Sequence, residues 1–201
     1  MLNLKEGEFA VRTARKAIEL WIIKNQELKV KDYPEKFKER LSVFTTLHTF
    51  PEKELRGCIG YVEHNYPLIT ALIKSAIAVT EDPRFPVLKQ EELKKIIVEV
   101  SILTKPELIK VKNPKEYLKK IKIGRDGLII KNGPYSGLLL PQVPIEQKWN
   151  EEEFLENLCF KAGLLPDQWL DENSKIYKFQ SQIFTEERPY GKIKEIKLNK
   201  I

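Results

Sequence analysis

The sequence predicts an α+β fold, and three observations lead to that prediction. Several segments repeat apolar residues with the period of an α-helix. Other segments are short, rich in β-branched residues and joined by tight turns. The two kinds of segment are mixed without the strict β-α-β alternation of a parallel sheet, which favours an antiparallel sheet with flanking helices. At 201 residues the chain suits one domain, or one domain with a smaller lobe.

The first part of the chain predicts a helix followed by a hairpin. Residues 6–25 carry apolar side chains at positions i, i+3, i+4 and i+7, which indicates a helix with one buried stripe. Residues 24–40 are charged and indicate a connector. Residues 42–47 and 55–63 resemble strands, and the link between them is too short for a parallel crossover. We therefore expect these strands to pair antiparallel.

An almost wholly apolar helix is expected after Pro67. Little polar surface remains on it, so we expect it to be buried. It should end near Asp82, because the residue before a proline avoids the helical region of the backbone. A short helix over residues 89–95 and a strand over residues 96–104 should follow.

Caps and turns mark the elements of the second half. Asn113 and Asn150 are typical residues to begin helices. Residues 124–140 have the pattern of a hairpin, with a turn at Asn132-Gly133. The remaining expectations are a helix that ends at Gly163, a strand over residues 176–184 and a basic tail over residues 192–201.

Composition narrows the class of protein. The net charge is +6, and the high content of Lys and Glu is also typical of proteins that work at high temperature. No apolar run is long enough to span a membrane and the first residues do not resemble a secretory signal, so we expect a cytoplasmic location. Cys58 and Cys159 are therefore expected to be free thiols. With only His48 and His64 beside them and no ligand spacing, no metal site is expected, and no cofactor is indicated.

The segment LRGCIG at residues 55–60 points most directly to chemistry. In a strand, Arg56 and Cys58 share a face about 6.6 Å apart, and the guanidinium would modestly favour the reactive thiolate. Gly57 and Gly60 lack side-chain bulk and would let a ligand or another backbone approach closely. The alternative is that Cys58 is an ordinary buried residue and that the glycines mark a bulge.

Three other side chains are lesser candidates. Glu99 is a carboxylate inside an apolar strand, which requires a polar cleft or a cation such as Arg56 or Arg84. A structural ion pair is the alternative to a catalytic role for Glu99. Arg84 belongs to a rigid corner at residues 82–86, and it either locks that corner or binds an anionic ligand. Gln142 lies in a stiff segment with two prolines and is a weak candidate.

The remaining polar and thiol groups favour structural roles. Cys159 fits the apolar stripe of its helix and is expected in the core, and His64 is expected to face solvent at a turn. Residues 105–125 carry eight basic and two acidic residues. A basic stripe can follow a phosphate backbone, but no nucleic-acid-binding motif accompanies this one, which favours a solvated lysine face.

Several motifs together resemble the AMMECR domain family. They follow the family's order and cover nearly the entire chain. The motifs are LRGCIG at residues 55–60, DPRF at 82–85, VEVSIL at 98–103, GLII at 127–130, GLLLPQV at 137–143 and CFKAGL at 159–164.

This resemblance implies a larger lobe with an antiparallel sheet and helices, a smaller lobe, and the hexapeptide near the cleft between them. It implies no particular reaction. In microbes the domain is associated with a Memo-type protein and a radical-SAM protein, which suggests a shared pathway. The candidate residues on the matching motifs are Arg56, Gly57, Cys58 and Gly60, with Arg84, Glu99 and Gln142 as lesser candidates.

The leading hypothesis is an enzyme, or enzyme component, that uses Cys58 at an interlobe cleft. Arg56 would favour the thiolate or hold an anionic substrate, and Glu99 would orient Arg56 or shuttle a proton. The alternatives are a binding or scaffold module in which Cys58 is inert, and a regulator that associates with nucleic acid.

Overall fold

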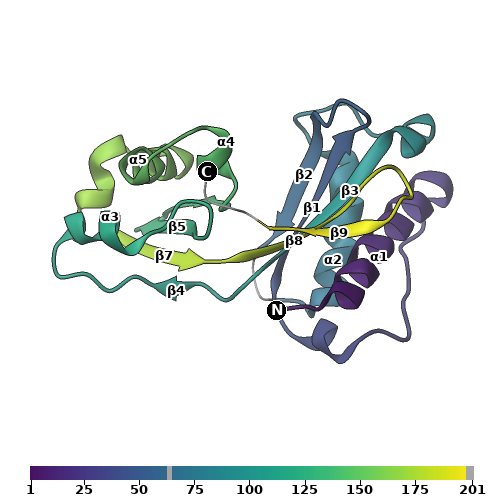
Figure 1. Cartoon of the computed structure of the whole chain (residues 1–201), viewed down its shortest axis with the longest axis horizontal. Coiled ribbons are helices and arrows are strands. Elements are labelled where there is room, and N and C mark those ends of the chain that lie inside the picture. Colours follow the sequence, from purple (N-terminus) through teal and green to yellow (C-terminus); the bar gives the residue numbers. More distant parts are fainter. Residues whose placement is uncertain (63–64, 198–201) are drawn as a thin grey trace. The chain divides into compact units, whose positions relative to one another are not determined.

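The computed structural model describes residues 1–62 and 65–197, and the chain forms two compact units (Figure 1). The first unit combines Met1–Leu103 with Gln182–Lys197, and the second contains Thr104–Ser181. Each unit has its own hydrophobic core. Both consist of helices and an antiparallel sheet, so the predicted α+β class is confirmed. No described helix is both long and apolar enough to cross a membrane.

A five-stranded sheet lies at the centre of the first unit, in the order β2-β1-β3-β8-β9. β1 pairs antiparallel with β2, as the sequence predicts, and with β3 on its other side. Glu63, the end of the second predicted strand, and His64 lie outside the described residues. The strands are β1 (Ser42–Thr49), β2 (Leu55–Tyr61), β3 (Ile96–Leu103), β8 (Ser181–Glu186) and β9 (Ile193–Ile196).

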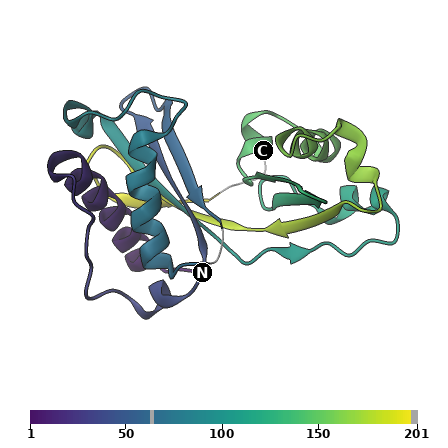
Figure 2. The same ribbon diagram turned by 180° about the vertical axis from the view of Figure 1, so that it is seen from behind.

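Two helices, α1 (Leu4–Lys24) and α2 (Leu68–Ala78), cover one face of this sheet (Figure 2). α1 begins slightly earlier than predicted, because the side chain of Asn3 accepts the backbone N–H of Glu6 in a capping box. α2 continues into a single turn, η2 (Val79–Glu81), and stops before the Asp-Pro pair as predicted.

A four-stranded sheet organises the second unit, in the order β4-β7-β5-β6. α5 (Glu151–Lys161) packs against β5 and β6. Asn150 and Glu153 form a capping box at its start, and Gly163 follows its end with a φ of 75°, both as the sequence predicts. The strands are β4 (Glu107–Leu108), β5 (Gly127–Asn132), β6 (Tyr135–Leu139) and β7 (Lys175–Phe179).

The other helices are short, and one of them lies in the segment predicted as a connector. η1 interrupts the charged segment after α1, where Phe37 is fully buried. α4 lies in the proline-containing segment around Gln142. The short helices are η1 (Glu35–Lys38), η3 (Gln90–Lys95), η4 (Pro114–Glu116), α3 (Tyr117–Lys120), α4 (Val143–Glu146) and η5 (Pro166–Leu170).

Two predictions about the C-terminal part of the chain are wrong. Residues 176–184 are not one strand, because β7 belongs to the second sheet and β8 to the first. The run of strand-forming residues continues across the change of sheet, so periodicity cannot reveal it. The predicted basic tail contains β9, which pairs with β8 as an edge strand. Its charged residues are typical of a strand at the edge of a sheet.

Candidate functional site

Cys58 and Glu99 lie on the face of the first sheet that is opposite α1 and α2. Thr45 points to the helices, because its hydroxyl lies 2.7 Å from a serine hydroxyl of α2. Side chains alternate along a strand, so Thr46 and His48 point to the opposite face. The register places Thr46 between Cys58 on β2 and Glu99 on β3. We call this surface the polar face, and its members are Thr46, His48, Cys58, Glu99, Thr185 and Lys194.

The backbone of Cys58 lies on the edge of the sheet, and two side chains cap it there. Its N–H donates to the carboxylate of Asp82 (2.8 Å), and its carbonyl accepts from the guanidinium of Arg84 (3.1 Å). Arg84 also donates to both carboxylate oxygens of Asp82, at 3.0 and 2.7 Å. This Asp82–Arg84 clamp takes the place of a neighbouring strand and satisfies polar groups that would otherwise attract one.

The clamp is strongly electrostatic. The hydrogen bonds from Arg84 lower the pKa of Asp82 to about 2, and the N–H of Cys58 adds to this effect, although burial opposes it. Arg84 therefore locks the corner at residues 82–86, which was one of the two predicted roles. Its side chain remains 56% exposed.

The thiol of Cys58 is partly buried and contacts Thr46, whose hydroxyl donates to Sγ at 3.2 Å. Burial raises the pKa of this thiol above its ordinary value. The hydrogen bond from Thr46 and the charge of Arg84 oppose the rise, whereas the carboxylates of Glu99 and Asp82 add to it. The structure therefore favours a protonated thiol at neutral pH rather than the thiolate that the leading hypothesis required.

Arg56 is engaged away from the thiol. It donates to both carboxylate oxygens of Glu92, at 2.8 and 3.2 Å, and to the carbonyl of Pro86 at 2.8 Å. The guanidinium whose charge acts on Cys58 is that of Arg84. Arg56 thus ties β2 to η3, and the expected pairing with Glu99 is not formed because Glu92 occupies the guanidinium.

Parts of the chain itself fill the space beside the two glycines. A Cβ atom at Gly60 would lie 2.2 Å from the ring of Phe44. A Cβ atom at Gly57 would lie 3.0 Å from the carbonyl oxygen of Val79 in η2. The close approach that the glycines predict is therefore made within the chain, and packing accounts for both residues.

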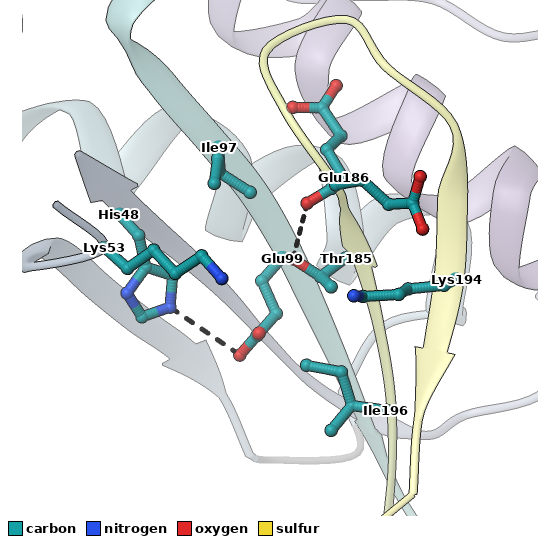
Figure 3. A pocket seen from close by; sticks show the side chains of 9 residues that line it. His48, Lys53, Ile97, Glu99, Thr185, Glu186, Lys194 and Ile196 are labelled. Carbon is teal, nitrogen blue, oxygen red and sulfur yellow. Dashed lines mark hydrogen bonds and ion pairs between the residues drawn. The ribbon is translucent and has the colours of Figure 1, made fainter. Parts of the chain in front are cut away.

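A cavity of about 230 Å³ opens over Glu99 (Figure 3). Glu99 is only 9% exposed, and its Oε1 lies 3.9 Å from Nε2 of His48, which is an ion-pair distance when the imidazole is protonated. Lys53 and Lys194 also line this cavity, and so do the acidic residues Glu186 and Glu187. Glu99 therefore lies in a polar cleft with an imidazole as its neighbour, rather than beside Arg56 or Arg84.

The two remaining candidates lie in the second unit. Gln142 precedes α4, and its buried Oε1 has no hydrogen-bond partner among the described residues. Cys159 lies fully buried in the core, as predicted, and burial raises the pKa of its thiol to about 11. Both cysteines are free. In the described part of the chain, no three His, Cys, Asp or Glu side chains gather closely enough to hold a metal ion.

Sequence reasoning missed most of the residues around the cavity. His48 could have been found, because it follows Thr46 by two positions on a predicted hairpin and so shares its face. Lys53 lies in the hairpin turn with a φ of 62°. Thr185 and Lys194 come from β8 and β9, far along the chain, and no local pattern connects them with Glu99.

Comparisons with known proteins agree with the resemblance in the motifs. The AMMECR1 family model matches residues 11–184. Protein MJ0810 of Methanocaldococcus jannaschii is 59% identical over 199 residues, which cover 98% of each chain. Protein PH0010 of Pyrococcus horikoshii is 54% identical over 193 residues, 94% of this chain and 93% of that one. The crystal structure of the uncharacterized protein PH0010 matches with a TM-score of 0.93 and 52% identity, over 98% of this chain and 99% of that one. The chain belongs to the AMMECR1 family.

Proposed function

We propose that the chain is an enzyme, or an enzyme component, that acts on a small molecule in the cavity over Glu99. The observation that carries this proposal is the nearly buried carboxylate of Glu99, which faces a cavity and has an imidazole 3.9 Å away. A carboxylate in such a position costs stability unless it is paired or used, and a cavity lined by a few convergent polar groups is a common kind of binding site.

The residue types around the cavity suit acid–base chemistry on a small polar molecule, because an imidazole, two lysines and three acidic residues line it. His48 would accept a proton from the substrate, and Glu99 would stabilise the imidazolium that forms. The separation of 3.9 Å exceeds a hydrogen bond, so Nε2 of His48 is not already hydrogen-bonded to Glu99, and a substrate would reach the imidazole from the cavity. Lys53 and Lys194 would donate hydrogen bonds to polar oxygens of the substrate.

Cys58 has a secondary place in this proposal. It is separated from Glu99 by Thr46, and its raised pKa argues against a resting thiolate. The rival function is a binding module in which Cys58 is inert. The Asp82–Arg84 clamp covers the edge of β2, and the chain's own atoms fill the space beside Gly57 and Gly60. Both observations favour a structural role for residues 55–60.

The test is an untargeted search for small molecules that the protein consumes or forms. Small-molecule extracts of an archaeal cell would be incubated with the wild type, with Glu99→Gln, His48→Asn and Cys58→Ser, and with the surface control Glu52→Gln. Mass spectrometry would identify compounds that are consumed or formed. We expect changes with the wild type, Cys58→Ser and Glu52→Gln that are lost in Glu99→Gln and His48→Asn.

Each other outcome has a definite meaning. Changes that survive in Glu99→Gln would place the chemistry elsewhere. Changes that are lost only in Cys58→Ser would restore the thiol as the reactive group. The absence of any change, together with thermal unfolding equal to that of the wild type in all four variants, would favour the binding module.

We also propose, from the family resemblance, that the chain works in the cytoplasm with a Memo-type protein and a radical-SAM protein. Co-elution of the three purified proteins in size-exclusion chromatography is the expected result. Independent elution of all three at micromolar concentrations would contradict a stable complex.

A further inference from the structure

The second sheet has one buried face and one opposite face that carries exposed lysines. Leu128, Ile130 and Ile176 are fully buried in the core that includes α5. Side chains alternate along each strand, so Lys131 and Tyr177 point to the opposite face. Lys131 is exposed there, and Tyr177 is partly exposed.

The strand register arranges this opposite face in two adjacent rows. Each row crosses neighbouring strands, which are about 4.8 Å apart. Lys110 follows β4 by two residues and continues its pairing with β7, because the N–H of Ile109 donates to the carbonyl of Ile176 at 2.9 Å. The apolar row consists of Leu108, Tyr177, Ile129 and Leu138. The lysine row consists of Lys110, Lys175 and Lys131.

The lysine row is a line of positive charge. All three lysines are exposed, and neither row contains a carboxylate. The acidic residues Asp171 and Glu172 line a neighbouring cavity of about 510 Å³ together with Lys110 and Lys175. Asp171 accepts hydrogen bonds from Asn132 and Asn173. Three cations in line without carboxylates between them complement a chain of evenly spaced anions.

Tyr177 gives this face a feature that a simple anion does not require. The ammonium of Lys131 lies 5.6 Å from the centre of the Tyr177 ring, so a cation occupies one face of the ring. An exposed cation–π contact contributes about 0.5–1 kcal/mol, whereas stacking of a nucleic-acid base on an aromatic ring contributes about 1–3 kcal/mol. A base can therefore displace Lys131 from the ring, and the freed ammonium can move to a phosphate.

We infer that this face of the second sheet binds single-stranded nucleic acid. The phosphates contact the lysine row, and a base stacks on Tyr177 within the apolar row. A single strand fits better than a duplex, because the bases of a duplex are stacked inside and cannot reach the tyrosine. This inference is independent of the proposed reaction at Glu99, which belongs to the other unit.

The experiment measures the affinity of the full chain for a 12-nucleotide single strand, as RNA and as DNA, over a series of salt concentrations. Three phosphate contacts predict a slope of log affinity against log salt of about −2. The row variant Lys110→Gln/Lys131→Gln/Lys175→Gln should lose most of that slope. The matched control Lys115→Gln/Lys119→Gln/Lys122→Gln removes the same charge from exposed positions outside the sheet and should keep it.

The tyrosine provides a separate arm of the experiment. Tyr177→Leu keeps the apolar contact but removes the π face, and it should weaken binding about 5- to 150-fold. Tyr177→Phe keeps the π face and should bind like the wild type. Thermal unfolding of each variant measures whether the second unit remains folded.

Four results would overturn the inference. The first is no binding at low salt. The second is an equal loss of affinity and of salt slope in the row variant and in the matched control, which would indicate general charge attraction. The third is equal binding of a duplex with no effect of Tyr177→Leu. The fourth is equally tight binding of a poly-glutamate peptide of the same charge, which would indicate an acidic protein partner instead.

Discussion

The carboxylate of Asp82 is almost fully buried and yet charged, because Arg84 and the N–H of Cys58 supply its hydrogen bonds. A buried anion of this kind is stable only when its partners are in place. The DPRF motif therefore supplies hydrogen bonds to the backbone at the exposed edge of β2, the strand that carries LRGCIG.

We predict that Asp82→Asn destabilises the first unit in a pH-dependent way. The pKa of Asp82 is lowered to about 2 in the folded protein, below its ordinary value of 3.8. Its charge therefore stabilises the fold above pH 3.8, by about 2 kcal/mol, and this contribution is lost as the pH falls through 2. Urea unfolding at several pH values should show a difference between wild type and variant at pH 7 that narrows below pH 4.

The surface variant Glu52→Gln is the control for this prediction, and it should differ little from the wild type at any pH. A stability difference for Asp82→Asn that stays constant from pH 7 to pH 2 would show that the charge of Asp82 is not what stabilises the clamp.

We predict that the Cys58 thiol reacts slowly with iodoacetamide at neutral pH, because burial raises its pKa. Thr46→Val removes the hydrogen bond that partly offsets this rise, so the reaction should become slower still. Glu99→Gln removes a nearby negative charge and should make it faster. Modification rates across a pH series in a Cys159→Ser background measure the titration. Fast modification at pH 7 would revive the thiolate hypothesis.

The site was only partly predictable at the level of residues. Alternation along a strand correctly separated Cys58 and Gly57 onto opposite faces. The same rule could not tell that Arg56 would reach Glu92, because the conformation of a long side chain depends on which carboxylate packs beside it. The burial of the Cys58 thiol could not be predicted from the sequence either, because it depends on neighbours from other strands.

At the level of elements, glycines set the distance between a strand and the helix that covers it. Gly137 on β6 lies directly under the end of α5, where an added Cβ atom would be 2.7 Å from the backbone nitrogen of Ala162. Backbone atoms cannot move aside as a flexible side chain can. α5 can therefore lie this close to β6 only because position 137 has no side chain.

We predict that Gly137→Ala destabilises the second unit by about 1–3 kcal/mol, the usual cost of overpacking. Gly133→Asn is the matched control: its φ of 55° suits asparagine and nothing lies within 4 Å of an added Cβ atom. Denaturant unfolding measures the two changes in a Trp21→Phe background, in which the remaining tryptophans, Trp149 and Trp169, both lie in the second unit. Equal stability of the two variants would contradict the proposed contact.

At the level of the whole molecule, a buried ion pair joins the two ends of the chain within the first unit. Arg15 on α1 forms a bidentate pair with Glu186 on β8, with Nε at 2.8 Å from Oε1. Arg15 also donates to the carbonyls of Leu93 and Ile96, and Glu186 accepts the N–H of Val98. The network connects the first helix, the central strand and the returning C-terminal strand.

We predict that Glu186→Gln destabilises the first unit by about 3–5 kcal/mol, because it leaves the buried guanidinium of Arg15 without a counter-ion. The double variant Arg15→Met/Glu186→Leu should lose less than this single change, since it leaves no uncompensated charge. Hydrogen exchange resolved by peptide should locate the loss in the first unit. The exposed pair variant Glu39→Gln should show no such change.

The sequence by itself determined the local features of this protein. Helix caps, hairpin turns, the buried stripe of α1, the core position of Cys159 and the family motifs all depend on residues close together in the chain. Only the tertiary structure decided which distant groups meet: Asp82 and Arg84 at the edge of Cys58, and His48 with Lys194 around Glu99. The physical reason is that strand register and side-chain packing bring together segments from opposite ends of the chain, and no periodicity within a segment encodes that meeting.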